Sequence, residues 1–275
     1  MSRAVLLMIA AALVAPGVVF AEPWPLAVRL MNYGDYQDAA WDHMREMGIK
    51  HVFMSIPGAD EAKGVIAKLE DYGFSTPVLR GQADLSKDTF ADELEPQLMV
   101  AREMGADFVF LSAKHGESTL EDAYRRLREA GDVAKRYDIV LTVETHPELG
   151  TNGDLQVQTM KGVDHPNVRI NFDTGNITYY NENTNPETEL EKSAQYVATV
   201  EFKDHNGALE VWDFPVLGQG KVDFEAVVRL LRQNNYSGPV TIEFEGTHGV
   251  ELDRAQTLQA IADSVAFART LAEFD

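Results

Sequence analysis

Short apolar runs alternate along the chain with longer stretches in which apolar residues recur at every third or fourth position. The short runs are typical of strands that are buried on both faces, and the longer stretches are typical of amphipathic helices. One helical stretch is marked by Leu120, Ala123, Tyr124, Leu127, Ala130, Val133, Ala134 and Tyr137. Asp223 is the expected N-cap of another helix, over residues 224–233.

The pattern predicts eight strands, each followed by a helical stretch. They are residues 26–33, 51–56, 76–81, 107–113, 139–145, 168–173, 197–203 and 240–244. Eight such units match a (β/α)8 barrel, which takes about 250 residues. A doubly wound open sheet is the alternative, but no glycine-rich phosphate loop follows any predicted strand. We therefore expect an α/β protein with one domain, a (β/α)8 TIM barrel over residues 22–275.

The N-terminus has the pattern of a secretory signal peptide over residues 1–21. Arg3 supplies a positive start, residues 4–14 form an apolar run, and small residues precede a cleavage point after Ala21. The run is shorter than the roughly 20 apolar residues that span a bilayer. We expect an exported protein, periplasmic or extracellular, without membrane association after cleavage. An uncleaved N-terminal anchor is the alternative.

The composition narrows the chemistry that this chain can carry. Its 275 residues include 44 acidic and 24 basic residues, which gives a formal net charge of −20. That charge argues against a nucleic-acid partner, because such partners require a basic surface. The chain has no cysteine, so disulfides, thiolate nucleophiles and cysteine zinc sites are excluded. Any metal ion would be held by Asp, Glu, His or Asn.

Four carboxylates stand at the ends of consecutive predicted strands: Glu144, Asp173, Glu201 and Glu243. In a (β/α)8 barrel the catalytic residues lie at this end of the strands. Four confined carboxylates cannot all stay ionised without a cation, and a divalent metal ion would relieve their repulsion. Oxygen ligands favour Mn²⁺, with Mg²⁺, Co²⁺ or Zn²⁺ as alternatives. The carboxylates could instead point outward and pair with basic residues of the helices.

Further polar residues near the strand ends are candidates for substrate binding. They are His146, Lys203, Asn176, His205, Arg80 and Lys114. His146 follows Glu144 by two residues and so lies on the same side of an extended chain; it could bind substrate or be an ordinary loop histidine. Lys203 could polarise a carbonyl, or it could form an exterior ion pair.

The strand-end motifs together resemble those of the xylose-isomerase-like barrels, a group of sugar isomerases and epimerases. The motifs are Glu144, the Asp-Thr-Gly-Asn of 173–176, the Glu-Phe-Lys-Asp-His of 201–205 and the Ile-Glu-Phe-Glu of 242–245. The group also includes hydroxypyruvate isomerase, inosose dehydratase and zinc AP endonucleases. The resemblance covers nearly the whole chain after the signal peptide. Its motifs are more specific for the group than for any one substrate.

The resemblance implies a divalent metal bound by Glu, Asp, His and Glu from the last four strands. By that resemblance Glu144 and Glu243 would be metal ligands and the acid/base pair, and Asp173 would be the second ligand. Two positions depart from the pattern. Glu201 stands where many relatives have His and some have Gln, and Asn176 stands where the family has His. The third carboxylate makes the expected site more anionic.

The leading functional hypothesis is a sugar isomerase or epimerase that moves a proton next to a carbonyl through an enediolate. One alternative is a lyase or dehydratase that eliminates from a 3-keto-glycoside or keto-sugar, and another is a non-catalytic carbohydrate-binding barrel. The AP endonuclease branch requires a histidine-rich cluster of zinc ions, and this chain has only 7 His. We expect a small-molecule sugar or keto-sugar partner, leave a homo-oligomer open, and consider cytosolic sugar phosphates poor candidates for an exported protein.

Overall fold

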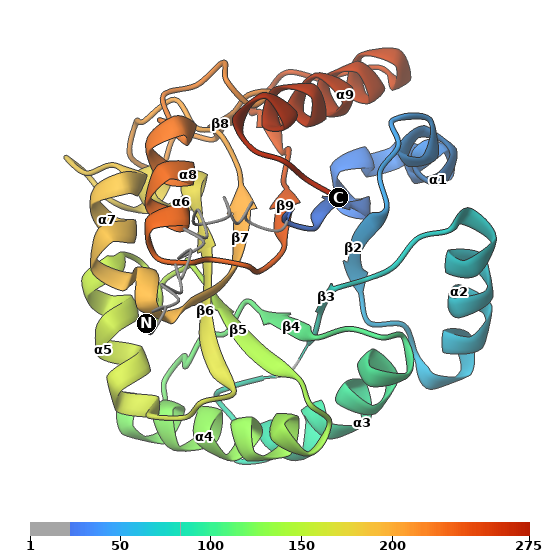
Figure 1. Ribbon diagram of the computed structural model, residues 1–275. Helices are drawn as coiled ribbons and strands as arrows, with labels where there is room; N and C mark the ends of the chain where they lie inside the picture. The colour runs from blue at the N-terminus through green and yellow to red at the C-terminus, as the bar shows by residue number, and fades with distance from the viewer. Residues whose placement is uncertain (1–22, 83) are drawn as a thin grey trace, which may run out of the picture.

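Eight parallel strands close into a barrel in the order β1-β2-β3-β4-β5-β6-β7-β9 in the computed structural model, which describes residues 23–82 and 84–275 (Figure 1). The strands are β1 (Leu26–Arg29), β2 (His51–Ser55), β3 (Val78–Arg80), β4 (Phe108–Leu111), β5 (Val140–Glu144), β6 (Val168–Asp173), β7 (Val197–Phe202) and β9 (Val240–Ile242). The last of these pairs with the first. The predicted single-domain (β/α)8 barrel is confirmed, and the open sheet is excluded.

Helices surround the strands (Figure 1). They are α1 (Gln37–Glu46), α2 (Ala59–Tyr72), α3 (Phe90–Glu103), α4 (Leu120–Arg136), α5 (Gly153–Val163), α6 (Thr174–Tyr180), α7 (Pro186–Ser193), α8 (Phe224–Gln233) and α9 (Arg254–Leu271), with short 3-10 segments η1 (Leu30–Tyr36) and η2 (Ala194–Tyr196). The predicted cap of α8 is confirmed, because the Asp223 carboxylate accepts the Ala226 N–H at 2.9 Å. Capping of this kind satisfies an amide that the helix itself leaves without a partner.

Side chains alternate along each strand between the helix layer and the barrel interior. The positions that face the helices are apolar and join one large core. Below the carboxylates, the interior holds a small separate cluster of Ala27, Phe53, Val78 and Phe110. Thr142, Asn171, Thr199 and Thr241 are also buried and occupy interior positions of β5, β6, β7 and β9. Half of the barrel is thus packed with aromatic and aliphatic groups, and the other half is polar.

The first strand is shorter than the sequence predicts. Residues 26–33 were expected to form a strand, but β1 ends at Arg29 and η1 begins at Leu30. Gly34 has a φ of 50° inside η1, a conformation that suits glycine. The Asn32 side chain donates to Ile242 O at 2.9 Å and accepts Phe244 N–H at 3.1 Å. The Asn32 side chain thus forms hydrogen bonds with the backbone at the carboxyl end of β9, where a longer β1 would have paired. The chain leaves the barrel wall here as η1.

A second, two-stranded antiparallel sheet, which the sequence did not predict, joins β8 (Asp213–Phe214) to β10 (Gly246–Thr247). Thr247 donates its hydroxyl to Asp213 Oδ1 at 2.6 Å, and His248 N–H donates to Trp212 O at 2.9 Å. Strands of two residues leave no periodic pattern to detect. The sheet links the loops that follow β7 and β9.

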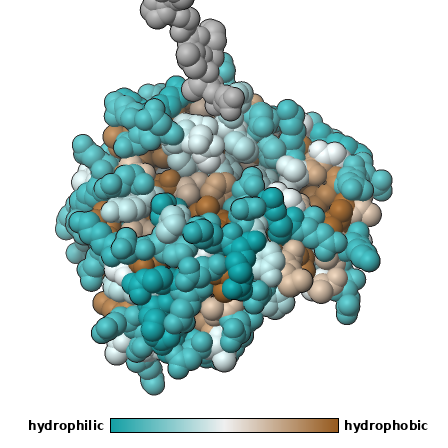
Figure 2. All heavy atoms as spheres, turned by 60° about the horizontal axis from the view of Figure 1, so that its bottom comes forward, coloured by the Kyte–Doolittle hydropathy of each residue, from teal (hydrophilic) through white to brown (hydrophobic). Residues whose placement is uncertain are grey.

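The predicted signal peptide, residues 1–21, lies outside the described residues. Among the helices that the structure describes, none is long and apolar enough to cross a membrane. Hydrophilic residues cover most of the face drawn in Figure 2. The excess of acidic over basic residues, 44 against 24, is in keeping with such a surface.

Candidate active site

The four carboxylates face the barrel interior. Glu144 and Asp173 are the last residues of β5 and β6, Glu201 lies near the end of β7, and Glu243 directly follows β9. Their exposed fractions are 9 %, 0 %, 0 % and 6 % respectively. The alternative of outward-facing carboxylates paired with helix residues is therefore excluded.

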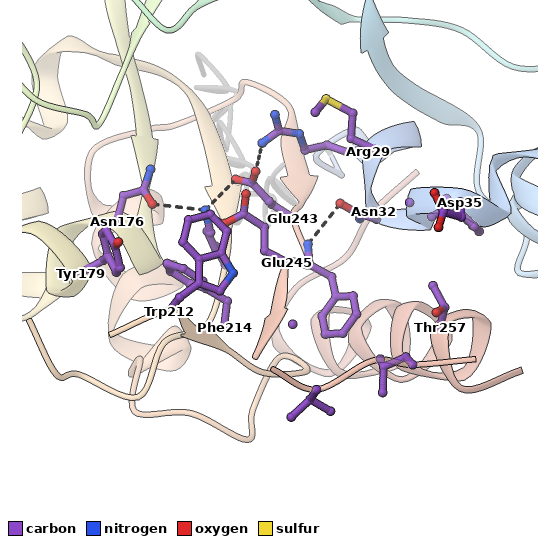
Figure 3. A pocket seen from close by; sticks show the side chains of 18 of the residues that line it. Arg29, Asn32, Asp35, Asn176, Tyr179, Trp212, Phe214, Glu243, Glu245 and Thr257 are labelled. Atoms are coloured by element: carbon purple, nitrogen blue, oxygen red, sulfur yellow. Dashed lines mark hydrogen bonds and ion pairs between the residues drawn. The ribbon is translucent and has the colours of Figure 1, made fainter. Parts of the chain in front are cut away.

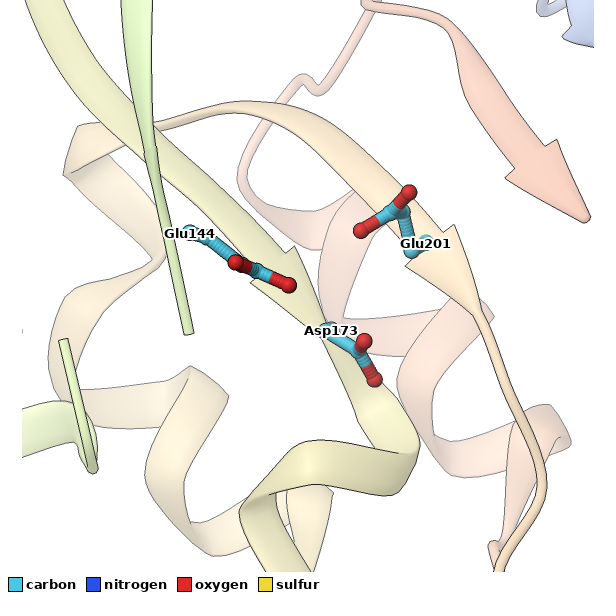
Figure 4. Close-up of side chains that lie close together, drawn as sticks. All are labelled: Glu144, Asp173 and Glu201. Atoms are coloured by element: carbon cyan, nitrogen blue, oxygen red, sulfur yellow. The ribbon is translucent and has the colours of Figure 1, made fainter. Parts of the chain in front are cut away.

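Three of these carboxylates converge on one point (Figure 4). Glu144, Asp173 and Glu201 each offer an oxygen atom, and these atoms lie within 4.8 Å of one another. The strand register explains part of this arrangement, because Asp173 and Glu201 are partners across β6 and β7. Hard cations bind carboxylate oxygens at roughly 2.0–2.6 Å, so one ion could contact oxygen atoms at this spacing.

Arg29 reaches the carboxylates from β1. Its Nη1 atom lies 3.0 Å from Glu201 Oε1. The same atom contacts Glu243 Oε1, as Figure 3 shows. The guanidinium carbon stands 4.7 Å from the centre of the Phe53 ring. Because Arg29 is only 3 % exposed, these carboxylates and rings replace the water that would otherwise solvate its charge.

Lys203 supplies a second buried cation on the opposite side of the cluster. Its Nζ atom lies 3.5 Å from Glu243 Oε2, 3.8 Å from Asp173 Oδ2 and 2.6 Å from Glu245 Oε2. It also donates a hydrogen bond to Asn176 Oδ1 at 3.2 Å. Burial acts to lower the pKa of Lys203, but the surrounding carboxylates outweigh burial and raise it. The ammonium group therefore stays charged.

The surrounding protein shifts the pKa values of Asp173, Glu201 and Glu243 in different directions. Burial raises the pKa of Glu201 to about 8, against the opposing effect of Arg29, and burial raises the pKa of Asp173 well above its usual range. Burial also opposes ionisation of Glu243, but Arg29 and Lys203 outweigh it and lower its pKa to about 2. An additional positive charge would allow Asp173 and Glu201 to ionise beside Glu243.

Buried carboxylate oxygens that accept no hydrogen bond give a further indication of a cation. Among the described residues, Asp173 Oδ2, Glu201 Oε2 and Glu243 Oε2 are buried and have no hydrogen-bond partner. Leaving a buried polar group without a partner costs about 1–3 kcal/mol, and more for a charged group. A donor set made of carboxylate oxygens suits a hard divalent ion such as Mn²⁺ or Mg²⁺. The residues present therefore fit the metal that the sequence predicts.

A cavity of about 770 Å³ opens above the cluster at the carboxyl end of the barrel. Glu144 and Glu243 line it, whereas Asp173 and Glu201 are not among its lining residues. Of the four strand-end carboxylates, two thus face the cavity and two lie behind them; Glu245 also lines the cavity. Trp212, which Figure 3 shows beside Phe214, also belongs to the wall.

His146 and Tyr180 form a hydrogen-bonded pair on the cavity wall. His146 Nδ1 lies 2.8 Å from Pro147 O, and Nε2 lies 2.8 Å from the Tyr180 hydroxyl. A carbonyl oxygen only accepts, so Nδ1 carries the proton and Nε2 accepts the Tyr180 O–H. Burial raises the pKa of Tyr180, so the hydroxyl keeps its proton for this bond.

The structure brings most of the predicted substrate-binding residues to the cavity, but not all. His146, Lys203, Asn176 and Arg80 line the cavity. Lys114 is exposed and lies outside the lining, because the chain after β4 turns toward solvent.

His205 is buried and also lies outside the cavity lining. Its Nε2 atom lies 2.9 Å from Val211 O, so it donates there, and its Nδ1 atom accepts the Thr178 hydroxyl at 2.8 Å. Burial lowers the pKa of His205. The two ring nitrogens join α6, through Thr178, to the loop that follows β7, through Val211, which makes His205 a structural residue.

Sequence reasoning missed Arg29, Tyr180 and Glu245 as members of this site. A single arginine inside the apolar run 26–33 was the available signal for Arg29. Its partner Glu201 is 172 residues away in the sequence, so the contact depends on closure of the barrel. Tyr180 carries no comparable signal, because its position depends on α6 directly following β6.

A family model described as xylose isomerase-like TIM barrel matches residues 25–271. Among curated proteins, an inosose dehydratase from Clostridium botulinum is 27% identical over 135 residues, which is 43% of this chain and 45% of that protein. An inosose dehydratase from Bacillus licheniformis is 28% identical over 140 residues, 44% and 45% of the two chains. The chain therefore spans less than half the length of these curated relatives.

Solved structures resemble the whole barrel. A xylose isomerase domain protein from Planctomyces limnophilus superposes with a TM-score of 0.73 at 23% identity, covering 91% of this chain and 98% of that one. A 3-keto-D-glucoside 4-epimerase from E. coli superposes with a TM-score of 0.69 at 18% identity, covering 90% and 99%. At these identities the likeness establishes the fold.

Proposed function

The chain belongs to the xylose isomerase-like TIM barrel family, and we propose that it is a metal-dependent sugar isomerase or epimerase. The observation that carries this proposal is the division of the four buried carboxylates. Glu144 and Glu243 line the cavity from β5 and from the end of β9, while Asp173 and Glu201 lie behind them. Two carboxylates that face one cavity suit a reaction in which one carboxylate removes a proton from the substrate and the other delivers a proton at another position.

Each residue of the site has a distinct part in the proposed reaction. A bound divalent ion, most suitably Mn²⁺, would supply Lewis-acid stabilisation of the negative charge that develops on an enediolate. Glu243, whose carboxylate contacts Arg29 and lies 3.5 Å from Lys203 Nζ, would be the base that accepts the proton next to the substrate carbonyl. Glu144 would deliver a proton drawn from solvent to the neighbouring carbon in an isomerase, or to the opposite face in an epimerase, and Glu243 would release the abstracted proton to solvent.

A lyase acting on a keto-sugar or 3-keto-glycoside is the second candidate. Tyr180 favours it, because its protonated hydroxyl lies on the cavity wall and, once turned from His146 toward the substrate, could protonate a departing hydroxide or alkoxide. The curated relatives named inosose dehydratase support the same reading. Elimination and isomerisation share the first proton abstraction, so both candidates use the same carboxylates.

The proposed substrate is an unphosphorylated sugar or keto-sugar, free or glycosidic. The sequence of residues 1–21 supports export to the periplasm or beyond, where sugar phosphates are scarce. The cavity of about 770 Å³ falls within the range of roughly 300–1,000 Å³ that holds small-molecule ligands, and has room for a glycoside.

Solvent exchange tests the proposal. The Mn²⁺-loaded protein should introduce deuterium from D₂O next to the carbonyl of at least one member of a panel of free, keto and glycosidic sugars. Glu243→Gln should lower that rate at least 10²-fold, the lower end of what general base catalysis contributes. Proton NMR and mass spectrometry follow the label, and a product lighter by one water would identify a lyase.

Glu251→Gln is the matched control, because Glu251 lines the outer part of the same cavity and is exposed. Its exchange rate should match that of the unchanged protein. A metal-loaded protein that binds a panel sugar but exchanges no deuterium would contradict an enzyme of either class, and would favour a non-catalytic carbohydrate-binding barrel.

A further inference from the structure

Glu201 poses a problem of charge. The resemblance implies a neutral His or Gln at this position, and the carboxylate adds a negative charge to an already anionic cluster. Glu201 is 0 % exposed, so water cannot solvate that charge. A buried carboxylate persists only when a cation or hydrogen-bond donors compensate it.

Arg29 is the residue placed to compensate Glu201. Its Nη1 atom lies 3.0 Å from Glu201 Oε1 and contacts Glu243 Oε1, so one atom bridges both carboxylates. The guanidinium is held between aromatic groups, with its carbon 4.7 Å from the Phe53 ring centre and 5.7 Å from that of Phe110. These rings belong to the interior cluster below the site, which fixes where the guanidinium lies.

Lys203 does not compensate the charge of Glu201. It donates to Asn176 at 3.2 Å and lies 2.6 Å from Glu245 Oε2. No ion pair or hydrogen bond joins Lys203 to Glu201 among the described residues. Arg29 is thus the cation that contacts Glu201 within the described part of the chain.

We propose that Arg29 and Glu201 form a charge-compensating pair that sets both the charge and the oxygen geometry of the metal site. Arg29 engages one oxygen of Glu201 and one of Glu243, and it leaves Oε2 of each without a hydrogen-bond partner. Glu201 Oε2 remains for a divalent cation, whereas Glu243 Oε2 also lies 3.5 Å from Lys203 Nζ. The inference rests on the proposed function only in assuming that a metal binds here.

The net charge of the buried cluster agrees with this compensating role of Arg29. The ionisable side chains of the cluster that are no more than 9 % exposed are Glu144, Asp173, Glu201, Glu243, Arg29 and Lys203. Fully ionised, four acids and two bases leave two negative charges, which one divalent ion neutralises. Glu245 is left out because its side chain is 29% exposed and therefore partly solvated.

A double-mutant cycle tests the pair. Arg29→Met leaves three negative charges and Glu201→Gln leaves one, whereas the double variant returns to two. Titration calorimetry with Mn²⁺ should show that Glu201→Gln weakens binding about 10–100-fold, the usual effect of disturbing the surroundings of a metal site. Arg29→Met should lower the melting temperature of the metal-free protein, and added Mn²⁺ should recover most of that loss.

In melting temperature and in Mn²⁺ affinity, the double variant should lose less than the two single variants added together, because the charge of Glu201 no longer needs compensation while Glu243 still loses its contact with Arg29. Arg80→Met is the matched control, because Arg80 lies on the neighbouring wall near the same Phe110 ring and makes no ion pair with the four carboxylates. It should leave Mn²⁺ affinity unchanged. Additive losses in the double variant would overturn the inference.

The cycle also separates this inference from the proposed function. If the unchanged protein bound no Mn²⁺, the metal proposal would fail, yet the melting temperatures of the metal-free variants would still report the pair. Recovery in the double variant would then support compensation without a metal. Mn²⁺ binding that is equal in all three variants would agree with the proposed metal site but would contradict the role proposed for Arg29.

Discussion

At the scale of single residues, the site depends on buried charges of opposite sign that stabilise one another. The Asp173, Glu201 and Glu243 carboxylates are buried, and within the described residues their ion-pair partners are Arg29 and Lys203. Removing one member of a buried ion pair is more damaging than removing both, because the remaining charge loses its compensation. The energetic weight of each residue here therefore depends on its neighbours.

Lys203→Met gives a direct measure of that dependence. Nζ lies within 4.0 Å of oxygens of Asp173, Glu243 and Glu245, so the variant should destabilise the metal-free protein by about 3–5 kcal/mol. Urea unfolding measures the loss. Lys87→Met is the control, since Lys87 is 53% exposed and its partners Asp84 and Glu93 are exposed as well, so its loss should cost less than about 1 kcal/mol. Equal losses would contradict the buried network.

Individual strand ends show how far the sequence predicts the site. The apolar residues flanking Glu144, Asp173, Glu201 and Glu243 alternate with them, so an inward orientation could be read from the sequence once the barrel was assumed. The predicted strand 168–173 agrees with β6 at both ends. Arg29 could not be assigned, because its contact with Glu201 spans 172 residues and five intervening strands.

At the scale of elements, the loops that follow β7 and β9 build the outer wall of the cavity. The Asp204 carboxylate accepts the backbone N–H groups of His205, Gly218, Gly220 and Val222 at 2.8–3.2 Å. A side chain at position 220 would meet Asp204 Oδ1 at 2.2 Å, which explains the glycine. The sequence motif drew attention to Lys203 and His205, but it is Asp204, between them, that anchors the loop.

The β8–β10 sheet gives a prediction that depends on pH. The Thr247 hydroxyl, and then the Asn206 amide, lower the pKa of Asp213 despite partial burial. A depressed pKa in the folded state means that this stabilisation is present above the unfolded pKa of about 3.9 and is lost as pH falls through the folded value. Thr247→Val should move the Asp213 pKa, followed by carboxyl NMR, back toward the usual value.

In the same variant the melting temperature of the protein should depend less steeply on pH in the acid range, because one of the two side-chain donors to Asp213 is gone. Thr270→Val is a suitable control, since Thr270 bonds only Phe267 O on α9. An Asp213 pKa that does not rise in Thr247→Val would contradict the assignment of this hydrogen bond as the cause of the shift.

At the scale of the whole molecule, the barrel is divided into two halves. The strands β5, β6, β7 and β9 carry the four carboxylates, whereas β2 and β4 supply the Phe53 and Phe110 rings that support Arg29. Closure between β9 and β1 brings Arg29 to the acidic half. The fold could be predicted because it repeats along the chain, while the paired charges depend on that closure.

We propose that Glu144, Asp173 and Glu201 hold one divalent metal ion beside Glu243, and that protons are exchanged with solvent at this site. The most direct test adds Mn²⁺ stepwise to metal-stripped protein in D₂O with a sugar that the loaded protein exchanges. We predict that the rate of deuterium incorporation rises with Mn²⁺ and saturates at one ion per chain, and that Asp173→Asn lowers both binding and exchange. Exchange that is independent of Mn²⁺, or that continues to rise beyond one ion per chain, would contradict the account.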